Sequence, residues 1–349
     1  MRASAGTDSI INPLEYPAWD EILLTHSEYS IFHSAGWARV LCESYNYNPV
    51  YFCSIVNSSI AYLIPLIEIH SSITGRRAVS LPYSDFCEPI FSDMPRSGEI
   101  MNRVIEYGKA ARWRYIEWRG GKAYFANRTP SQTFMAHSLE LGRNENEVLS
   151  SFRDSTRRNI KKAEQSGVSV YLKNTLDSLK RFYTLHCITR KMHGLPPQPF
   201  SFFEQIFKHI ISQGKGFVAM ATYEGRDIAG AVWLHFGKRA VYKFAASDRK
   251  YQHLRANNLI IWQAIRWYVA NGFEYISFGR TNPGNTGLLQ FKRGWGTKEQ
   301  TLNYYKYSLK SAEFVRDRSM VPGSLKWINS VAPMAALKLA GRWLYGHMG

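Results

Sequence analysis

The alternation of apolar and polar positions in the first half of the chain predicts strands joined by short amphipathic helices. Period-two runs predict strands, at 50–56, 60–69, 76–81, 115–118 and 133–141. Helical spacing predicts helices, at 19–24, 35–44 and 97–112. This half is therefore β-rich with helical connections, and it closes near Gly142.

The second half has a clearer order of elements. It opens with a charged helical segment at 144–167, a strand at 168–172 and two helices at 176–193 and 200–213. A three-strand antiparallel meander, a helix, a strand, a short helix and a last strand follow, at 217–223, 228–236, 240–246, 257–271, 275–278, after Thr286, and at 301–309. The order favours an α/β fold with a mixed sheet.

The helix predicted at 257–271 has an apolar side that is expected to be buried. Its members recur at helical spacing, and they are Leu259, Ile260, Trp262, Ala264, Ile265 and Val269. The strand predicted at 275–278 follows this helix.

The stretch from Tyr275 to Gly296 places two cations at one end of the predicted sheet. The apolar run 275–278 predicts a buried strand that delivers Arg280 to its carboxyl end. After a turn-forming segment, Thr286 is a suitable N-cap for the short helix that ends near Lys292. Cations at the open end of a sheet favour an anionic ligand in an α/β protein.

Three sequence blocks carry a resemblance to a known family. They are FGR followed by GLLQFKRGWG within 278–296, TRRNIKKA with GV within 156–168, and FHS with a later GRR and LPYSD within 32–85. In these blocks the chain resembles the Fem-type (FemABX) peptidyltransferases and their BioF2-like relatives, which have the acetyltransferase-like GNAT fold. The likeness spans roughly residues 30 to 308.

The resemblance implies two tandem GNAT-like domains with mixed central sheets. We expect an N-terminal domain at 1–143 and a C-terminal domain at 144–309, which contains a basic linker helix at 154–166. A basic, aromatic tail at 310–349 would follow. The chain has no room for the long coiled coil that some members insert, so it is similar to the shorter members.

Composition favours an anionic partner and a reducing compartment. Of the 349 residues, 44 are Lys or Arg and 27 are Asp or Glu, which gives a net charge of +17. The four cysteines form no CxxC pair and are expected to be reduced. The start of the chain lacks the pattern of a signal peptide, and no apolar run reaches membrane-spanning length. We therefore expect a cytoplasmic protein.

The catalytic candidates are Lys292, Phe291 and Asp85. The resemblance implies that the lysine of the FK pair lies in the catalytic region, which selects Phe291 and Lys292. Asp85 follows a strand, and its carboxylate could accept a proton from an attacking amine. A turn-stabilising role for Asp85 is at least as good an explanation.

Basic residues of the linker helix are candidates for substrate binding. They lie three and four positions apart and share one broad helix face, and they are Arg157, Arg158, Lys161 and Lys162. A solvated face is the ordinary explanation of such a run. The resemblance instead favours a site for substrate phosphates or an RNA backbone. Asp154 or Ser155 is expected to cap this helix and Gly167 to end it.

Three further residues are assigned to substrate binding. Arg280 would bind phosphate beside the Gly-rich turn. Tyr242 and Lys243 lie on the central strand of the meander, where simple alternation would point only one of them into a cleft.

No redox or metal cofactor is expected. His186 and His193 share a helix face, but no third ligand accompanies them. The segment 249–258, where a coenzyme A-using GNAT protein has its Gly-rich pyrophosphate turn, contains no glycine. This weakens acyl-coenzyme A as a donor without excluding it.

The leading expectation is an acyltransferase that forms an amide on an amine of a cell-wall or envelope precursor. The resemblance implies aminoacyl-tRNA as the donor and a phosphorylated or lipid-linked acceptor. An N-acyltransferase that uses an acyl thioester for exopolysaccharide or lipid synthesis is the alternative. A non-catalytic RNA- or membrane-binding protein belongs to another class. The aromatic and basic tail, 325–349, would either dock on the core or contact an anionic membrane at its cytoplasmic face.

Overall fold

The computed structural model describes residues 8–92, 97–142, 144–317 and 332–349, and they form two compact units. Unit 1 comprises Met1–Phe134, Thr301–Ser319 and Leu344–Gly349, and unit 2 comprises Met135–Gln300 and Met320–Trp343. Neither unit is one continuous stretch of sequence, because later segments return to each.

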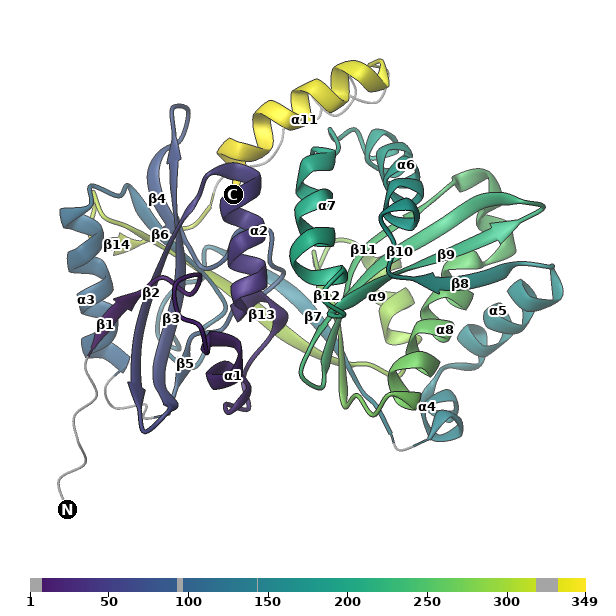
Figure 1. The fold of residues 1–349 in the computed structure, drawn as a ribbon, viewed down its shortest axis with the longest axis horizontal. Coiled ribbons are helices and arrows are strands. Elements are labelled where there is room, and N and C mark those ends of the chain that lie inside the picture. The colour runs from purple at the N-terminus through teal and green to yellow at the C-terminus, as the bar shows by residue number, and fades with distance from the viewer. Residues whose placement is uncertain (1–7, 93–96, 143, 318–331) are drawn as a thin grey trace. The chain divides into compact units, whose positions relative to one another are not determined.

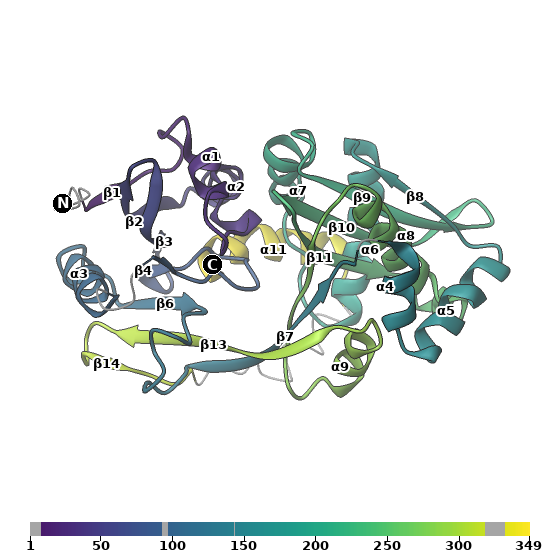
Figure 2. The same ribbon diagram turned by 90° about the horizontal axis from the view of Figure 1, so that it is seen from below.

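Unit 1 contains a mixed sheet whose spatial order is β1-β2-β3-β4-β6-β13. The strands are β1 (Ser9–Ile11), β2 (Asn48–Val56), β3 (Ser59–Ser71), β4 (Gly75–Val79), β6 (Tyr115–Arg119) and β13 (Lys298–Ser308). Two short strands lie off this path: β5 (Ile90–Phe91) pairs with β3 and β14 (Glu313–Phe314) pairs with β13. Figure 2 shows β13 running beside β6, with which it pairs antiparallel.

Helices and one short 3₁₀ turn precede or connect these strands in the described part of unit 1. They are α1 (Trp19–Leu24), η1 (Ile31–His33), α2 (Ala35–Tyr45) and α3 (Ser97–Ala110). Helix α3 buries Ile100, Met101 and Val104 in a core that also contains Trp113, Trp118 and Tyr305. The connection β4–α3–β6 makes β4 and β6 parallel, as such a crossover requires.

Unit 2 has the sheet order β7-β12-β11-β10-β9-β8. The strands are β7 (Gln132–Glu140), β8 (Ser169–Lys173), β9 (Gly216–Tyr223), β10 (Arg226–Phe236), β11 (Arg239–Ser247) and β12 (Tyr275–Thr281). Strands β9, β10 and β11 are the expected antiparallel meander. The prediction of a mixed α/β fold is confirmed in this unit.

Helices cover both faces of the sheet in unit 2 (Figure 1). Helices α6 (Leu176–Met192) and α7 (Phe200–Ile206), which runs into a π-helical turn at Phe207–Ile211, lie on one face. Helices α5 (Asp154–Gln165) and α8 (Ala256–Ala270) lie on the other face, and α4 (Glu145–Ser151) precedes α5. The predicted buried side of α8 is confirmed except at Val269, which is half-buried.

Two predicted details of the helices are wrong. The segment 144–167 is not one helix, because the extended residues Phe152 and Arg153 separate α4 from α5. Asp154 and Ser155 are not caps, since Arg153 is the N-cap of α5 and its side chain makes no capping bond. Gly167 does end the basic helix, with a positive φ of 79° that favours glycine.

The described part of the tail folds as α11 (Met334–Met348). Leu337 and Tyr345 are buried, so α11 packs on the protein. Packing on the core was one of the two expectations for the tail. Among the other apolar residues of the tail, Leu339 and Trp343 are exposed, and Trp327 and Ile328 lie outside the described residues. No helix in the described part of the chain combines the length and hydropathy that a membrane span requires.

Candidate active site

Strands β11 and β12 separate at the point where the predicted cations lie. They pair in parallel over only three residues each, Arg239–Val241 with Tyr275–Ser277. On its other side, β12 pairs with β7 up to Thr281, with an irregularity between Ser277 and Arg280. Gly279 lies inside this irregularity with a φ of 66°, which an L side chain rarely adopts. The pairing of the two strands ends at Val241 of β11 and Ser277 of β12, and this point is called the open end of the sheet.

Lys292 is buried at this open end. It lies on α9 (Thr286–Arg293), and only 4% of its surface is exposed. Its Nζ donates hydrogen bonds to the carbonyl oxygens of Gly279 at 3.2 Å and Arg280 at 3.3 Å. The predicted proximity of Lys292 to the end of β12 thus holds. These hydrogen bonds also have a purely structural explanation, because the two carbonyl oxygens accept from an ammonium group that is buried.

Helix α9 starts one residue earlier than predicted, at Thr286 itself. The Oδ1 of Asn285 accepts a hydrogen bond from the backbone N–H of Leu288 at 3.2 Å, so Asn285 is the N-cap and Thr286 is the first helical residue. Leu289 is buried and Phe291 half-buried on the side of α9 that faces the unit. This amphipathic side sets the rotation of α9 and hence the position of Lys292.

Trp295 and two glycines fix the end of α9 against the start of α5. Trp295 is fully buried, and its ring packs at 5.0 Å from Phe152 and at 6.2 Å from Phe291 between ring centroids. A Cβ at Gly294 would lie 2.5 Å from Thr156 Oγ1, and one at Gly296 would lie 2.7 Å from the carbonyl oxygen of Ser151. The sequence block GLLQFKRGWG therefore packs tightly against the residues around α5, and this packing holds Lys292 in place.

A second cluster near Lys292 was not found from the sequence. His137 on β7 is buried, and its Nε2 lies 2.8 Å from Glu299 Oε2. The same carboxylate accepts two hydrogen bonds from Arg293, each at 2.7 Å. Burial lowers the pKa of His137, and the charge of Lys292 lowers it further. In this cluster Glu299 links Arg293 of α9 to His137 of β7. In the sequence, only the position of Arg293 next to Lys292 could have suggested it.

The basic helix α5 presents most of its predicted cations to solvent. Thr156, Ile160 and Ala163 are its buried side, which packs on α8. Arg158, Lys161 and Lys162 are exposed. Arg157 is half-buried instead; it pairs with Asp154, and it donates to the carbonyl oxygen of Ser150 at 3.1 Å.

Tyr242 and Lys243 lie at a β-bulge, so simple alternation does not apply to them. Trp233 of β10 is opposite Tyr242 and Val232 is opposite Phe244, which leaves Lys243 as the extra residue. The Tyr242 ring packs on Trp233, and burial raises its pKa. The expectation that only one of the two residues can face a cleft was wrong in its premise, because a bulge interrupts the alternation.

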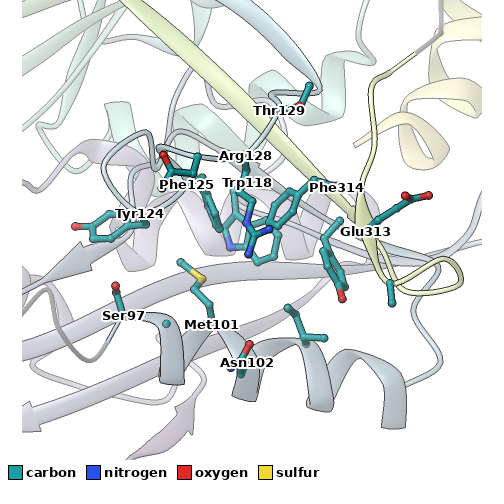
Figure 3. A pocket seen from close by; sticks show the side chains of 15 residues that line it. Ser97, Met101, Asn102, Trp118, Tyr124, Phe125, Arg128, Thr129, Glu313 and Phe314 are labelled. Atoms are coloured by element: carbon teal, nitrogen blue, oxygen red, sulfur yellow. The ribbon is translucent and has the colours of Figure 1, made fainter.

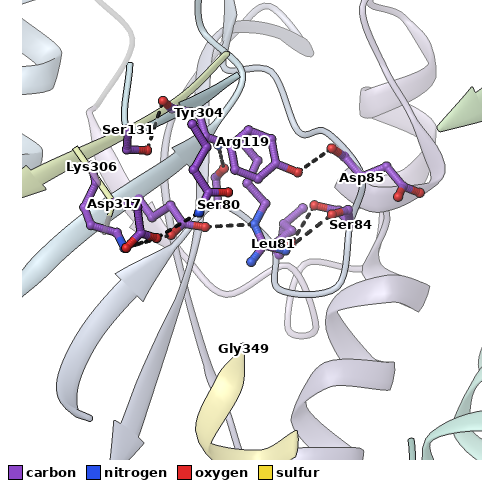
Figure 4. A network of polar contacts seen from close by, with 12 residues as sticks. Ser80, Leu81, Ser84, Asp85, Arg119, Ser131, Tyr304, Lys306, Asp317 and Gly349 are labelled. Atoms are coloured by element: carbon purple, nitrogen blue, oxygen red, sulfur yellow. Dashed lines mark hydrogen bonds and ion pairs between the residues drawn. The ribbon is translucent and has the colours of Figure 1, made fainter. Parts of the chain in front are cut away.

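Asp85 belongs to unit 1, whereas the other predicted site residues belong to unit 2. Its loop is held by backbone contacts (Figure 4). The Tyr304 hydroxyl donates to the Asp85 carbonyl oxygen at 2.6 Å, and the Arg119 guanidinium donates to the Ser84 carbonyl oxygen at 3.3 Å. Glu117 accepts a hydrogen bond from Arg119 at 3.1 Å, which keeps that buried cation paired. These contacts fix the position of the loop.

A cavity of about 490 Å³ in unit 1 contains none of the predicted site residues (Figure 3). Its lining combines helix α3, the end of β6, the loop 124–129 and the β14 hairpin. Aromatic side chains predominate among its larger residues, and they are Trp118, Tyr124, Phe125, Tyr307 and Phe314. The polar side chains at this cavity include Arg128 and Glu313. Nothing in this lining connects the cavity with Lys292.

His186 and His193 were considered as metal ligands, and the segment 249–258 as a turn that could bind pyrophosphate. His186 is buried among aromatic rings, with Phe203 at 5.1 Å between ring centroids. Among the described residues, no group of three or more His, Cys, Asp or Glu side chains is placed to hold a metal ion. In the turn, Arg249–Leu254 form a 3₁₀ helix, and Arg255 adopts a positive φ of 61° before α8 begins.

Comparisons with known proteins agree with this architecture. Residues 150–293 match the family model described as an acetyltransferase (GNAT) domain. No curated protein matches the chain. The solved structure of FemX is similar at a TM-score of 0.69 and 14% identity, over 87% of this chain and 98% of FemX.

Two further solved structures share the fold at low identity. The C-terminal domain assigned to a lysylphosphatidylglycerol synthetase of Agrobacterium fabrum has a TM-score of 0.54 and 11% identity, over 84% of this chain and 90% of that one. A tandem GNAT protein of the clavulanic acid biosynthesis pathway has a TM-score of 0.54 and 8% identity, over 87% and 98%. Residues 150–293 therefore contain an acetyltransferase (GNAT) domain, and over most of its length the chain has a fold similar to that of FemX.

Proposed function

We propose that the protein transfers an aminoacyl group to an amine of a cell-wall or envelope precursor and so forms an amide. The observation that carries this proposal is the buried ammonium of Lys292 at the separation of β11 and β12. We place the meeting of the acyl group and the amine at this open end, which lies within the residues that match the acetyltransferase (GNAT) domain. The name of the lysylphosphatidylglycerol synthetase domain, together with the resemblance to the Fem-type peptidyltransferases, supports an aminoacyl group over a simple acetyl group.

The main requirement of this acyl transfer is stabilisation of the negative charge that develops on the carbonyl oxygen. The amine of the acceptor attacks the ester carbonyl of aminoacyl-tRNA, the new C–N bond forms, and the ester C–O bond breaks. The amine loses a proton, and the departing ribose hydroxyl gains one. Lys292 is fixed by two carbonyl oxygens, so its positive charge needs no reorganisation as negative charge develops on the carbonyl oxygen. No proton acceptor is assigned, since Asp85 belongs to unit 1 and Lys292 to unit 2.

The remaining predicted residues are assigned to substrate binding. Arg280 follows the bulge of β12, and Arg158 and Lys161 are exposed on α5. We assign Arg280 to a phosphate of the acceptor and the exposed cations of α5 to the tRNA backbone. Phe291, Tyr242, Lys243 and Arg157 would shape or support this region. A lipid-linked acceptor would bring the protein to the cytoplasmic face of an anionic membrane.

A donor that is an acyl thioester of coenzyme A is the second candidate. The tandem GNAT neighbour is described with reference to acetyl-coenzyme A, which favours this donor. The turn before α8 opposes it, because it is a 3₁₀ helix without glycine. A non-catalytic RNA-binding protein would keep the basic face of α5 but would not need Lys292.

The variant Lys292→Met tests the proposal, since it keeps most of the apolar stem and removes the charge. Transfer of radiolabel from aminoacyl-tRNA to amine-bearing envelope precursors is the measurement. We expect turnover to fall about a hundredfold or more, because one preorganised stabiliser of the transition state is lost. Arg280→Met is expected to raise KM and leave turnover nearer normal.

The matched control is Lys298→Met, which makes the same change at an exposed lysine of β13. This control should transfer label at the rate of the unaltered protein. A folded Lys292→Met protein with normal turnover would remove Lys292 from the reaction and favour the non-catalytic alternative. Thermal unfolding of all variants separates lost chemistry from lost folding.

A further inference from the structure

Helix α11 has two apolar sides, of which one is buried and the other is exposed. The inner side carries Leu337, which is 2% exposed, and Gly341, whose missing side chain lets the helix touch the carbonyl oxygen of Pro197. The opposite side carries Leu339 and Trp343, one turn apart, with exposures of 70% and 60%. The described residues therefore bury the inner side of α11, whereas Leu339 and Trp343 on the opposite side stay largely exposed.

The charges of α11 are all of one sign. Lys338 and Arg342 are exposed, and they lie along one edge of the outward apolar side. The helix contains no Asp or Glu. The ammonium of Lys338 lies 5.6 Å from the ring centroid of Tyr183, which steadies its stem while its residue remains exposed. Exposed apolar side chains bordered only by cations are complementary to a surface that is apolar inside and anionic outside.

We propose that the outward side of α11 is a docking surface for an anionic lipid bilayer. Leu339 and Trp343 would enter the boundary between headgroups and acyl chains, while Lys338 and Arg342 would pair with lipid phosphates. Two apolar side chains are a small area for a stable protein–protein interface, which needs about 800 Å² on each partner. They are enough for reversible interfacial binding when cations add to them. The formal charge of +17 would bring the whole protein toward such a surface.

This inference goes beyond the proposed acyl transfer, because binding to lipid requires neither donor nor acceptor. The experiment is flotation of the full chain with vesicles of phosphatidylcholine alone and of phosphatidylcholine mixed with phosphatidylglycerol. We expect binding to the mixed vesicles, weakening as NaCl rises, and little binding to phosphatidylcholine alone. Failure of flotation would overturn the docking surface and leave the proposed transfer reaction standing.

Point variants locate the surface. Leu339→Ser combined with Trp343→Ser should weaken binding about tenfold or more, because the apolar contribution is lost. Lys338→Gln combined with Arg342→Gln should weaken binding to anionic vesicles by roughly fivefold for each cation. Both pairs are exposed, so the unfolding temperature should change little.

Two matched controls make the same chemical changes elsewhere. Leu24→Ser alters an exposed leucine of α1, and Lys173→Gln with Lys180→Gln removes two exposed lysines of β8 and α6. Both controls should float like the unaltered protein. Equal loss in the controls and in the α11 variants would overturn the assignment to α11. A self-associating protein that becomes monomeric in the Leu339/Trp343 variant while still floating would show a protein interface instead.

Discussion

At the scale of single residues, burial decides what each ionisable group can do. Lys292 and His186 are both buried, but Lys292 keeps two carbonyl partners, whereas the Nε2 of His186 has no hydrogen-bond partner. Burial lowers the pKa of His186 from 6.5 to about 3, so this ring stays neutral in the folded protein. His186 is therefore a core residue.

The neutral state of His186 predicts a dependence of stability on pH. Its folded pKa is lower than its unfolded pKa of 6.5, so below pH 6.5 the unfolded chain binds a proton that the folded protein does not. The free energy of unfolding should therefore fall between pH 6.5 and about 3, by at most about 1.4 kcal/mol per pH unit from this group. Above pH 6.5 His186 should contribute no slope.

The variant His186→Phe isolates this effect in denaturant titrations. Other groups titrate over the same range, so the informative quantity is the difference between the two proteins at each pH. We expect that difference to shift steadily in favour of the variant as the pH falls below 6.5. A constant difference between pH 7 and pH 4 would show that His186 takes up its proton in the folded state.

At the scale of elements, close packing holds α9 where the sequence could only place it approximately. The local pattern predicts a short helix after a strand, but it does not contain the contacts of Gly296 with Ser151 or of Glu299 with His137. Those contacts depend on the register between β7 and β12 and on the start of α5. The predicted cap at Thr286 was off by one residue because Asn285 and Thr286 are both good caps by composition.

Replacement of Gly296 by alanine should loosen α9. The new Cβ would lie 2.7 Å from the Ser151 carbonyl oxygen, and the φ of 67° adds backbone strain. We expect the free energy of unfolding to fall by about 2 kcal/mol or more, together with a loss of transfer activity through Lys292. Gly167→Ala is the matched control, since Gly167 has a φ of 79° and a Cβ added there would meet no atom within 4 Å.

The control should show backbone strain alone, about 1 kcal/mol, with transfer activity unchanged. Chemical denaturation measures both losses on one scale. If Gly296→Ala costs no more than Gly167→Ala, the close approach of α9 to Ser151 does not contribute to the position of Lys292.

The turn between β11 and α8 carries a prediction about the donor. The segment Arg249–Leu254 is a 3₁₀ helix, and Arg255 is in the left-handed region, so the backbone there lacks the freedom that a glycine would give for close contact with a pyrophosphate. Calorimetry with acetyl-coenzyme A and longer acyl-coenzyme A should show weak binding or none. Tight binding would make the thioester donor the leading candidate in place of aminoacyl-tRNA.

At the scale of the whole molecule, chain order and compact units do not coincide. Local periodicity predicted most helices and strands, and the resemblance predicted the GNAT architecture. Neither showed that Thr301–Ser319 and Leu344–Gly349 count with unit 1. The reason is physical, since a pairing between β6 and β13 joins residues far apart in sequence and leaves no periodic trace in either strand. For the same reason, the sequence did not show that the end of the tail belongs to unit 1.

The end of α11 is part of the folded structure of unit 1. The buried guanidinium of Arg77 donates to the His347 carbonyl oxygen at 2.7 Å, and the Tyr47 hydroxyl donates to the Tyr345 carbonyl oxygen at 3.2 Å. Deletion of residues 345–349 should leave Arg77 buried without these partners, which costs several kcal/mol. We therefore expect thermal unfolding of this truncated protein at a clearly lower temperature, whereas Leu339→Ser should unfold like the full chain. Equal stability of the truncated and full chains would show that water replaces the lost carbonyls. Point variants on the outward side of α11, rather than truncations, are consequently the sound way to test membrane binding.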